Sequence, residues 1–134
     1  MKLIKNRVYT ENGASNFASQ SFGQQGQYAR IYQVGNDNTA TQNMDAGVVN
    51  EQYAYQVGSW NESYQTTTGK YNVSTVDQEG TANFAVINQS SEDNMADVRQ
   101  LGYGNEGFID QTSNNNDANI DQTGSNNGAT ILQN

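Results

Sequence analysis

The sequence predicts an all-β fold, a β-solenoid of about six two-stranded coils with cross-β amyloid stacking, in one domain that covers residues 1–134. Three observations predict it. A Gln-x-Gly motif recurs about every 22 residues, each unit divides into two 11-residue halves with the pattern NxAxIxQxGxx, and the key positions of a half are two residues apart. Repetition of this length is typical of solenoids, in which each repeat stacks on its neighbours.

The Gln-x-Gly motif sets the repeat boundaries, because its steps are 23, 22, 22 and 22 residues. Its glutamines are Gln33, Gln56, Gln78, Gln100 and Gln122. The repeats cover approximately residues 5–26, 27–49, 50–71, 72–93, 94–115 and 116–134. One step before Gln33 lies Glu11, and the one extra residue falls in DAGVV, Asp45–Val49, where a Gly-containing turn tolerates an insertion.

The spacing of two places the key residues of each half on one face of a strand. We expect the β-branched and apolar residues of this face to form the core, namely Ile31, Val76, Ile87, Val98, Ile109, Ile120 and Ile131. Small residues, mostly Ala, precede them by two positions and allow facing strands to approach closely. Glycines after the glutamines are expected to supply the positive φ of tight turns: Gly35, Gly58, Gly80, Gly102 and Gly124.

The amide side chains have a reason in such a stack, because equivalent residues lie above one another and each amide can donate to the next. On one sheet we expect self-assembly ladders of the five motif glutamines together with Asn50, Asn72, Asn94 and Asn116. On the other sheet we expect Gln89, Gln111 and Gln133 with Asn61, Asn83, Asn105 and Asn127. Before residue 83 this second sheet has Phe22, Met44 and Thr67 in place of the last Gln, so its amide ladder is expected to be lost there.

The outward positions form columns too. Asp77, Arg99 and Asp121 fall in one column with alternating charge, and Tyr32 and Tyr55 occupy the same column in earlier coils. On the other sheet Phe84, Val86, Phe108 and Leu132 face outward. These apolar residues indicate either lateral association and adhesion or the ordinary exposure of scattered apolar side chains, and the sequence leaves both interpretations open.

Composition excludes several functions. The net charge of −8 and only six basic residues argue against a nucleic-acid partner. The absence of Cys and His removes thiolate zinc sites and the commonest general base, so we expect no enzymatic activity, no cofactor and no metal site. No apolar run is long enough to insert into a membrane. The opening MKLIKN lacks the apolar stretch of a signal peptide, so we expect a secreted protein whose leader has been removed.

The pattern also favours association over a capped monomer. The last half-unit, NGATILQ, keeps the repeat, and proline, which commonly interrupts strand edges, is absent. We therefore expect a homopolymer that grows head to tail. A disordered amide-rich tract would not hold an 11-residue period, whereas a soluble ligand-binding or ice-binding solenoid remains the alternative, although its outward Thr residues form no common row.

Three segments resemble the repeats of the curlin family, QEGTANFAVINQ (Gln78–Gln89), QLGYGNEGFIDQ (Gln100–Gln111) and QTGSNNGATILQ (Gln122–Gln133). The family commonly has Ser at the leading position, where this chain has Asn50, Asn72, Asn94 and Asn116. The resemblance implies a subunit of an extracellular functional amyloid on the cell surface, in biofilm matrix. It is most like the major fibre-forming subunit, with the minor nucleating subunit as the alternative. It further implies a nucleator subunit, an outer-membrane secretion channel and chaperones as partners.

Overall fold

The computed structural model describes residues 5–10, 13–24 and 26–134. Within these residues all the regular secondary structure is β-strand. The odd-numbered strands are β1 (Lys5–Thr10), β3 (Tyr28–Asn36), β5 (Glu51–Ser59), β7 (Val73–Thr81), β9 (Met95–Tyr103) and β11 (Asp117–Ser125). The even-numbered strands are β2 (Phe17–Phe22), β4 (Thr39–Ala46), β6 (Glu62–Thr68), β8 (Phe84–Gln89), β10 (Glu106–Gln111) and β12 (Gly128–Gln133). No helix in this part of the chain could cross a membrane.

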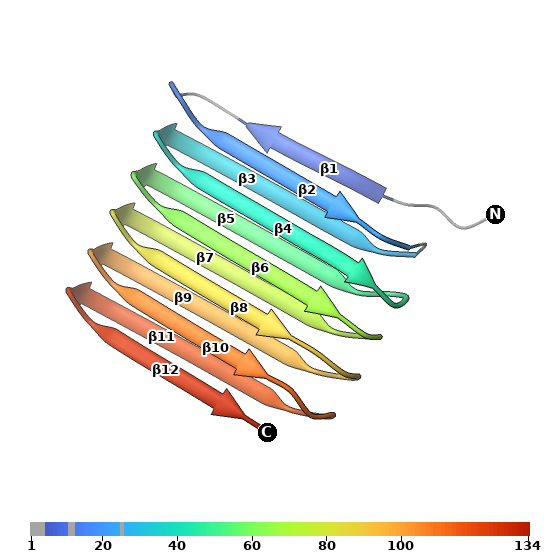
Figure 1. Ribbon diagram of the computed structural model, residues 1–134. Helices are drawn as coiled ribbons and strands as arrows, with labels where there is room; N and C mark the ends of the chain where they lie inside the picture. Colours follow the sequence, from blue (N-terminus) through green and yellow to red (C-terminus); the bar gives the residue numbers. More distant parts are fainter. Residues whose placement is uncertain (1–4, 11–12, 25) are drawn as a thin grey trace.

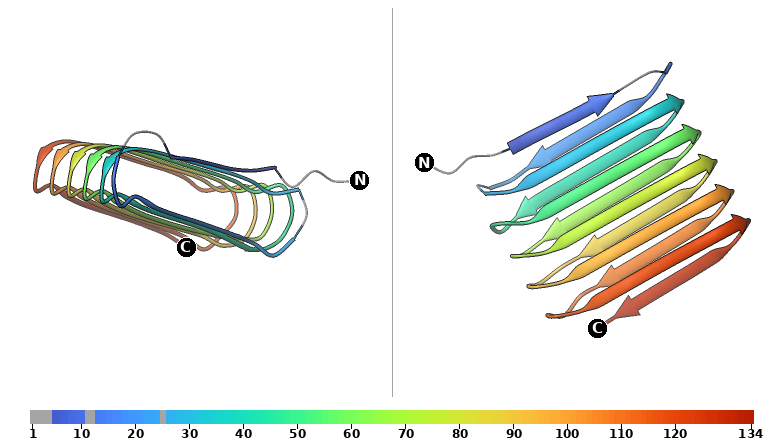
Figure 2. Two further views of the ribbon diagram at one scale, coloured as in Figure 1. Left: turned by 90° about the horizontal axis from the view of Figure 1, so that it is seen from above. Right: turned by 180° about the vertical axis from the view of Figure 1, so that it is seen from behind.

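The strands form two six-stranded sheets, and the chain alternates between them (Figure 1). The first sheet has the order β1-β3-β5-β7-β9-β11, and the second has the order β12-β10-β8-β6-β4-β2. All pairings are parallel, and seen along the stack the chain follows a flattened coil (Figure 2). We define a coil as one odd strand with the even strand that follows it. The predicted all-β solenoid with 22-residue repeats is confirmed.

The coils stack in register, so equivalent residues pair directly. Gln33 pairs with Gln56, and the same column continues through Gln78 and Gln100 to Gln122. The extra residue is Asp45, because the pairing of β4 with β6 shifts between Met44 and Ala46. A bulge therefore absorbs the insertion within the predicted stretch, and the residues on either side keep their faces.

The first strand departs from the predicted register by one residue. The repeat spacing places Glu11 beside Gln33, but the structure pairs Thr10 with Gln33 and Val8 with Ile31. Glu11 itself lies outside the described residues. A shift by one exchanges the two faces of a strand. In the observed register the uncharged residues Val8 and Thr10 pair with Ile31 and Gln33. The predicted register would instead have paired the charged residue Glu11 with the buried amide of Gln33, and burying a charge costs free energy.

The interior between the sheets is narrow and mixed in polarity. Six of the predicted core residues, Ile31, Val76, Ile87, Val98, Ile109 and Ile120, are buried, and Ile131 on the edge strand β12 is partly buried. The larger apolar cluster lies in the coils from β7 onward, whereas the smaller consists of Ile31, Ala40 and Ala54. Buried amides and hydroxyls fill much of the remaining space, which agrees with the small apolar content of the sequence.

The predicted turn glycines lie near the ends of the odd strands rather than in the turns themselves. Gly80 has φ of 121° and is the next-to-last residue of β7, and the turn residue of left-handed conformation is Ala82, with φ of 57°. A Cβ on Gly80 would lie 2.0 Å from the carbonyl oxygen of Gly102 in the next coil. Gly35, Gly58 and Gly102 meet the next coil in the same way. These glycines are therefore required by the close approach of stacked backbones as well as by their φ.

Candidate assembly site

The motif glutamines form a continuous ladder along the first sheet. Each Nε2 donates to the Oε1 of the next coil, from Gln33 to Gln56 at 2.8 Å, Gln56 to Gln78 at 2.8 Å, Gln78 to Gln100 at 2.9 Å and Gln100 to Gln122 at 2.9 Å. The direction of donation is always from the N-terminal coil to the C-terminal coil. All five side chains are buried, so the bonds offset the cost of removing the amides from water.

The same glutamines connect the two sheets. The Nε2 of Gln78 also donates to the backbone oxygen of Glu62 at 2.9 Å, and that of Gln100 donates to the oxygen of Phe84 at 2.9 Å. In the last coil, Gln122 donates to the oxygens of Glu106 at 2.9 Å and Asn127 at 3.0 Å. Its second donor therefore bonds within its own coil, at the position where the other four glutamines donate to the next coil.

The second sheet carries two shorter ladders in different columns. From residue 84 onward, Gln89 donates to Gln111 at 3.0 Å, and Gln111 donates to Gln133 at 2.8 Å, as its sequence pattern predicts. The expected loss of the ladder in the earlier coils is wrong. There Gln20 donates to Gln42 at 2.8 Å, and Gln42 donates to Gln65 at 2.8 Å.

The earlier ladder was missed because it lies two residues before the position of the later one. Gln65 pairs with Ile87, and Thr67 pairs with Gln89. A displacement by two residues keeps the amide on the inward face, so the ladder continues while its column changes. The signal was present in the sequence, since Gln20, Gln42 and Gln65 occupy the same position of three successive coils.

An asparagine column runs along the turns that lead into the second sheet, and its bonds point the opposite way. Each Nδ2 donates to the Oδ1 of the preceding coil, from Asn38 to Asn16 at 3.1 Å, Asn61 to Asn38 at 3.2 Å, Asn83 to Asn61 at 3.0 Å, Asn105 to Asn83 at 3.0 Å and Asn127 to Asn105 at 2.9 Å. The backbone N–H of each later Asn donates to the same oxygen. Gln and Asn bonds thus give the stack a chemical direction.

The other predicted asparagine column is less regular. The Nδ2 of Asn72 donates to Asn50 at 3.4 Å, but that of Asn94 donates to the backbone oxygen of Ser90 at 2.9 Å and that of Asn116 to the oxygen of Ser113 at 2.9 Å. The backbone N–H groups of Asn72, Asn94 and Asn116 still donate to the Oδ1 of the preceding Asn. Direct side-chain bonds are therefore confined to the first pair of this column. Among all the predicted ladder residues, Asn116, Asn127 and Gln133 are the ones not buried, because they lie in the last coil.

Hydroxyl groups accept hydrogen bonds from amides near the point where the amide column of the second sheet moves by two residues. Thr67 Oγ1 accepts a hydrogen bond from Gln52 at 2.7 Å, Ser74 Oγ accepts one from Gln65 at 3.3 Å, and Ser63 Oγ accepts one from Gln56 at 3.4 Å. Ser63 and Ser74 take the place of the usual small apolar residue, and Thr67 takes the place of Gln. Gln65, at the end of its ladder, and Gln52, which belongs to no ladder, thus have hydroxyl groups as partners.

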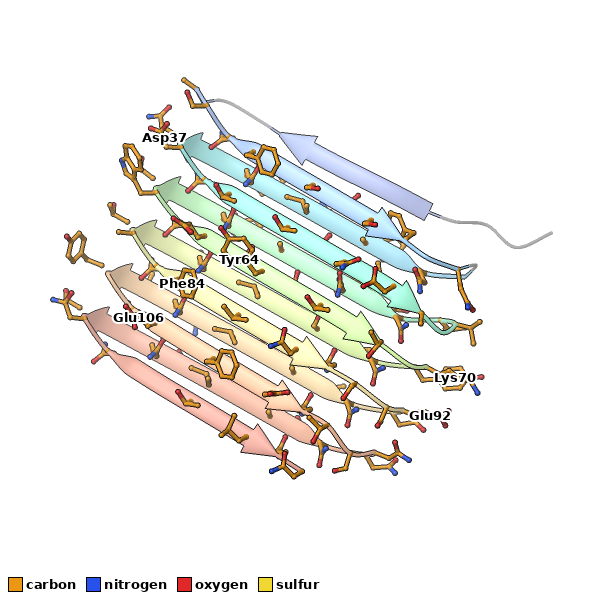
Figure 3. All side chains as sticks on the ribbon, in the orientation of Figure 1. Asp37, Tyr64, Lys70, Phe84, Glu92 and Glu106 are labelled. Atoms are coloured by element: carbon orange, nitrogen blue, oxygen red, sulfur yellow. The ribbon has the colours of Figure 1, made fainter. Side chains whose placement is uncertain are left out.

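The outer faces carry the predicted columns. Tyr32 and Tyr55 stack with ring centroids 4.9 Å apart, and Arg99 contacts Asp121 at 3.7 Å. Lys70 and Glu92 form a further ion pair of 3.3 Å between turns of neighbouring coils (Figure 3). On the second sheet, Tyr64 and Phe84 lie against each other with centroids 5.8 Å apart (Figure 3). Exposed ion pairs of this kind contribute little to stability and chiefly support register.

Titratable groups on the first sheet are perturbed by burial. Desolvation raises the pKa of Asp77 above its usual value, Glu79 adds to this effect and Arg99 opposes it. Desolvation, with a hydrogen bond to Glu51, raises the pKa of Tyr53 to about 12. Both groups lie on the outer face of the first sheet, where Tyr53 also lines a pocket with Arg30 and Tyr55. Within the described residues, no group of three or more acidic, His or Cys side chains could hold a metal ion.

The fold and its interior define a class of protein, a parallel β-solenoid repeat protein whose coils are joined by amide ladders. The curlin associated repeat matches residues 74–102 and 91–124, which include β9 and most of the strands around it. These matches support the curlin family and indicate a structural subunit of curli type. No curated protein matches the sequence.

Proposed function

We propose that this protein is the fibre-forming subunit of an extracellular functional amyloid of curli type, assembled head to tail. One observation carries the proposal, namely the identity of the coil-to-coil contacts. Gln78, Gln100 and Gln122 occupy equivalent buried positions of successive strands, and the first two donate to the next coil. The edge strand β11 thus carries the inward residues that β7 and β9 present to their successors, which makes it a template for a further coil.

Templated folding is the mechanism that these contacts support. An isolated chain must order many residues before distant strands pair, and its interior gains only small apolar groups and amide bonds in return. At a fibre end, each incoming coil gains backbone bonds, amide bonds and apolar contact on an edge that is already formed. Nucleation is therefore slow and elongation fast.

The remaining parts of the proposal come from the family match and the composition. Subunits of curli type form fibres outside the cell, so we place this chain in the biofilm matrix, where its fibres support adhesion to surfaces. The acidic composition and the regular repeats favour the major subunit over the nucleating one. Its proposed partners are further copies of itself, a nucleator subunit, an outer-membrane secretion channel and chaperones.

The first experiment is a thioflavin-T time course on freshly desalted protein, with and without sonicated fibre fragments, followed by fibre diffraction. We expect a lag that the fragments abolish and reflections near about 4.8 Å and about 10 Å, the spacings of strands and of packed sheets. A sample that stays monomeric and rich in β-structure for days would overturn the proposal and favour a soluble solenoid that binds a ligand on its outer face.

A second experiment tests whether the amides of the last coil provide the template. We expect Gln122→Leu and Asn127→Leu each to slow seeded elongation by roughly tenfold, because a fibre end loses a directed hydrogen bond at a site that becomes buried. Asn119 lies on the exposed face of the same coil, so Asn119→Leu is the matched control and should elongate at nearly the original rate. Equal rates for all three variants would contradict the role of the ladders.

A further inference from the structure

The two ends of the first sheet carry opposite charges. The edge strand β11 begins with the exposed residue Asp117, and the opposite edge strand, β1, contains Lys5 and Arg7. We propose that β11 of one copy pairs with β1 of the next copy in the register that β1 already uses with β3, and that Asp117 and Lys5 select this junction. This inference rests on the proposed function and specifies which surfaces meet in the fibre.

The inward residues of β11 match those that β1 already accepts. Within the chain, β1 pairs with β3, whose buried inward residues are Ala29, Ile31 and Gln33. The corresponding buried residues of β11 are Ala118, Ile120 and Gln122. The two sets have the same residue types in the same order. The free side of β1 would therefore meet on β11 of another copy the same inward residue types that its other side meets on β3.

Charge distinguishes the two neighbours of β1. In the register of the fold, Lys5 pairs with Tyr28 and Arg7 with Arg30, so neither cation has a carboxylate as its partner on β3. The column of Tyr28 ends at Asp117, whose partner on β9 is the uncharged Met95. A second copy that continues the stack places Lys5 beside Asp117. Asp121, the other acidic residue of β11 in this sheet face, already contacts Arg99.

Other junctions are disfavoured by the same charges. Pairing β11 with β11 brings together two strands with two carboxylates each, and pairing β1 with β1 brings together two strands with two cations each. On the second sheet, head-to-tail stacking places Ile131 beside Gln20, a combination that Ile87 and Gln65 already make inside the chain. It also places Gln133 beside Phe22, which has no counterpart in the fold. We therefore assign the selectivity to the β11–β1 side.

Charge exchange tests the junction. The variants are Asp117→Lys, Lys5→Asp and the double exchange, and the measurement is self-seeded elongation at low salt, followed by thioflavin-T. Each single variant places like charges at every junction, so we expect elongation roughly fivefold slower than for the original chain. The double exchange restores opposite charges and should return the rate to within about twofold. High salt should shrink all these differences.

An equimolar mixture of the two single variants gives the most direct comparison. The tail of Asp117→Lys is complementary to the head of Lys5→Asp, and the tail of Lys5→Asp is complementary to the head of Asp117→Lys. The mixture has the mean net charge of the original chain, and it should elongate faster than either variant alone. Glu106→Lys, an exposed residue of β10 outside the last coil, is the control for a change of net charge and should stay within about twofold of the original rate.

The outcomes separate the two proposals. Single variants that elongate at the original rate, or a mixture no faster than its components, would overturn the Asp117–Lys5 junction while fibre formation stands. If the original chain does not elongate on its own fibre fragments, the proposed function fails, and the junction fails with it.

Discussion

The first three coils and the last three stack their strands in the same parallel order but have different interiors. In the earlier coils the second sheet carries inward Gln20, Gln42 and Gln65, and among the side chains that the structure describes the apolar cluster of this region consists of three buried residues. In the later coils the same column holds Ile87, Ile109 and Ile131, and the amides lie two residues further along. The curlin associated repeat matches only residues 74–124, which belong to the later coils.

The comparison teaches which features of the repeat are interchangeable. A buried column accepts either amides or β-branched residues, provided that each column continues for several coils and that hydroxyl groups lie where it changes. The face of each residue is not interchangeable. The amide column of the second sheet moves by two residues between the first three coils and the last three, which keeps the amides on the inward face. The one extra residue, Asp45, is absorbed in a bulge that preserves the faces around it.

The largest expected effect comes from deleting one residue at two different places. Deleting Asp110 from β10 moves Gln111 to the outer face, so we expect fibres to lose about 4 kcal/mol or more in stability, or not to form. Deleting Asp45 removes the bulge and leaves every later residue on its face, so the expected change is below about 1 kcal/mol. The measurement is the guanidinium concentration at which fibres dissociate, and similar losses for both deletions would break the comparison.

A smaller effect distinguishes the middle of the earlier ladder from its end. Gln42→Ile removes the acceptor of Gln20 and the donor to Gln65 and to the Arg30 oxygen. Gln65→Ile removes the acceptor of Gln42 and the donor to the Tyr53 oxygen and to Ser74 Oγ, but it places Ile beside Ile87. We expect Gln42→Ile to cost about 1 kcal/mol more than Gln65→Ile in the same guanidinium assay, because it breaks the ladder on both sides while the isoleucine of Gln65→Ile extends the apolar column. If Gln65→Ile were the more harmful change, the apolar column could not be extended backward, and the boundary between the halves would be set by something other than amide pairing.

The smallest expected effect concerns pH and the outer face of the later coils. Burial raises the pKa of Asp77 in the folded state, so protonation favours folding; this contribution is present below the unfolded pKa and is lost as the pH rises through the folded value. Asp77→Asn should therefore stabilise fibres at pH 7, by less than about 1 kcal/mol after allowance for solvent screening. Fibres of the variant should also gain less stability on acidification than the original fibres, as followed by guanidinium dissociation at pH 3 to 7. A variant as sensitive to pH as the original chain would assign the effect to Asp97, whose pKa burial also raises.

Much of the fold could be predicted from the sequence, because the period of 22 and the alternation of two are independent of any distant contact. They placed Ile87, Ile109 and Gln100 inside and predicted the stacked pair Tyr32 and Tyr55, and the structure agrees. The errors have a common origin. Extending the period misplaces the first strand by one residue, and an expectation based on the commonest amide column overlooks the ladder of Gln42.

The sequence by itself determined the repeat length, the residues that share the inward face and the columns in which they stack, since these depend only on spacing along a strand. Only the tertiary structure decided the direction of the amide bonds, the bonds from Gln78 and Gln100 to the opposite sheet and the use of hydroxyl groups where columns change. It also decided that glycines such as Gly80 are required by the carbonyl of the next coil. Such contacts depend on the distance between sheets and coils, and that distance is set when all the strands have paired and the interior is filled.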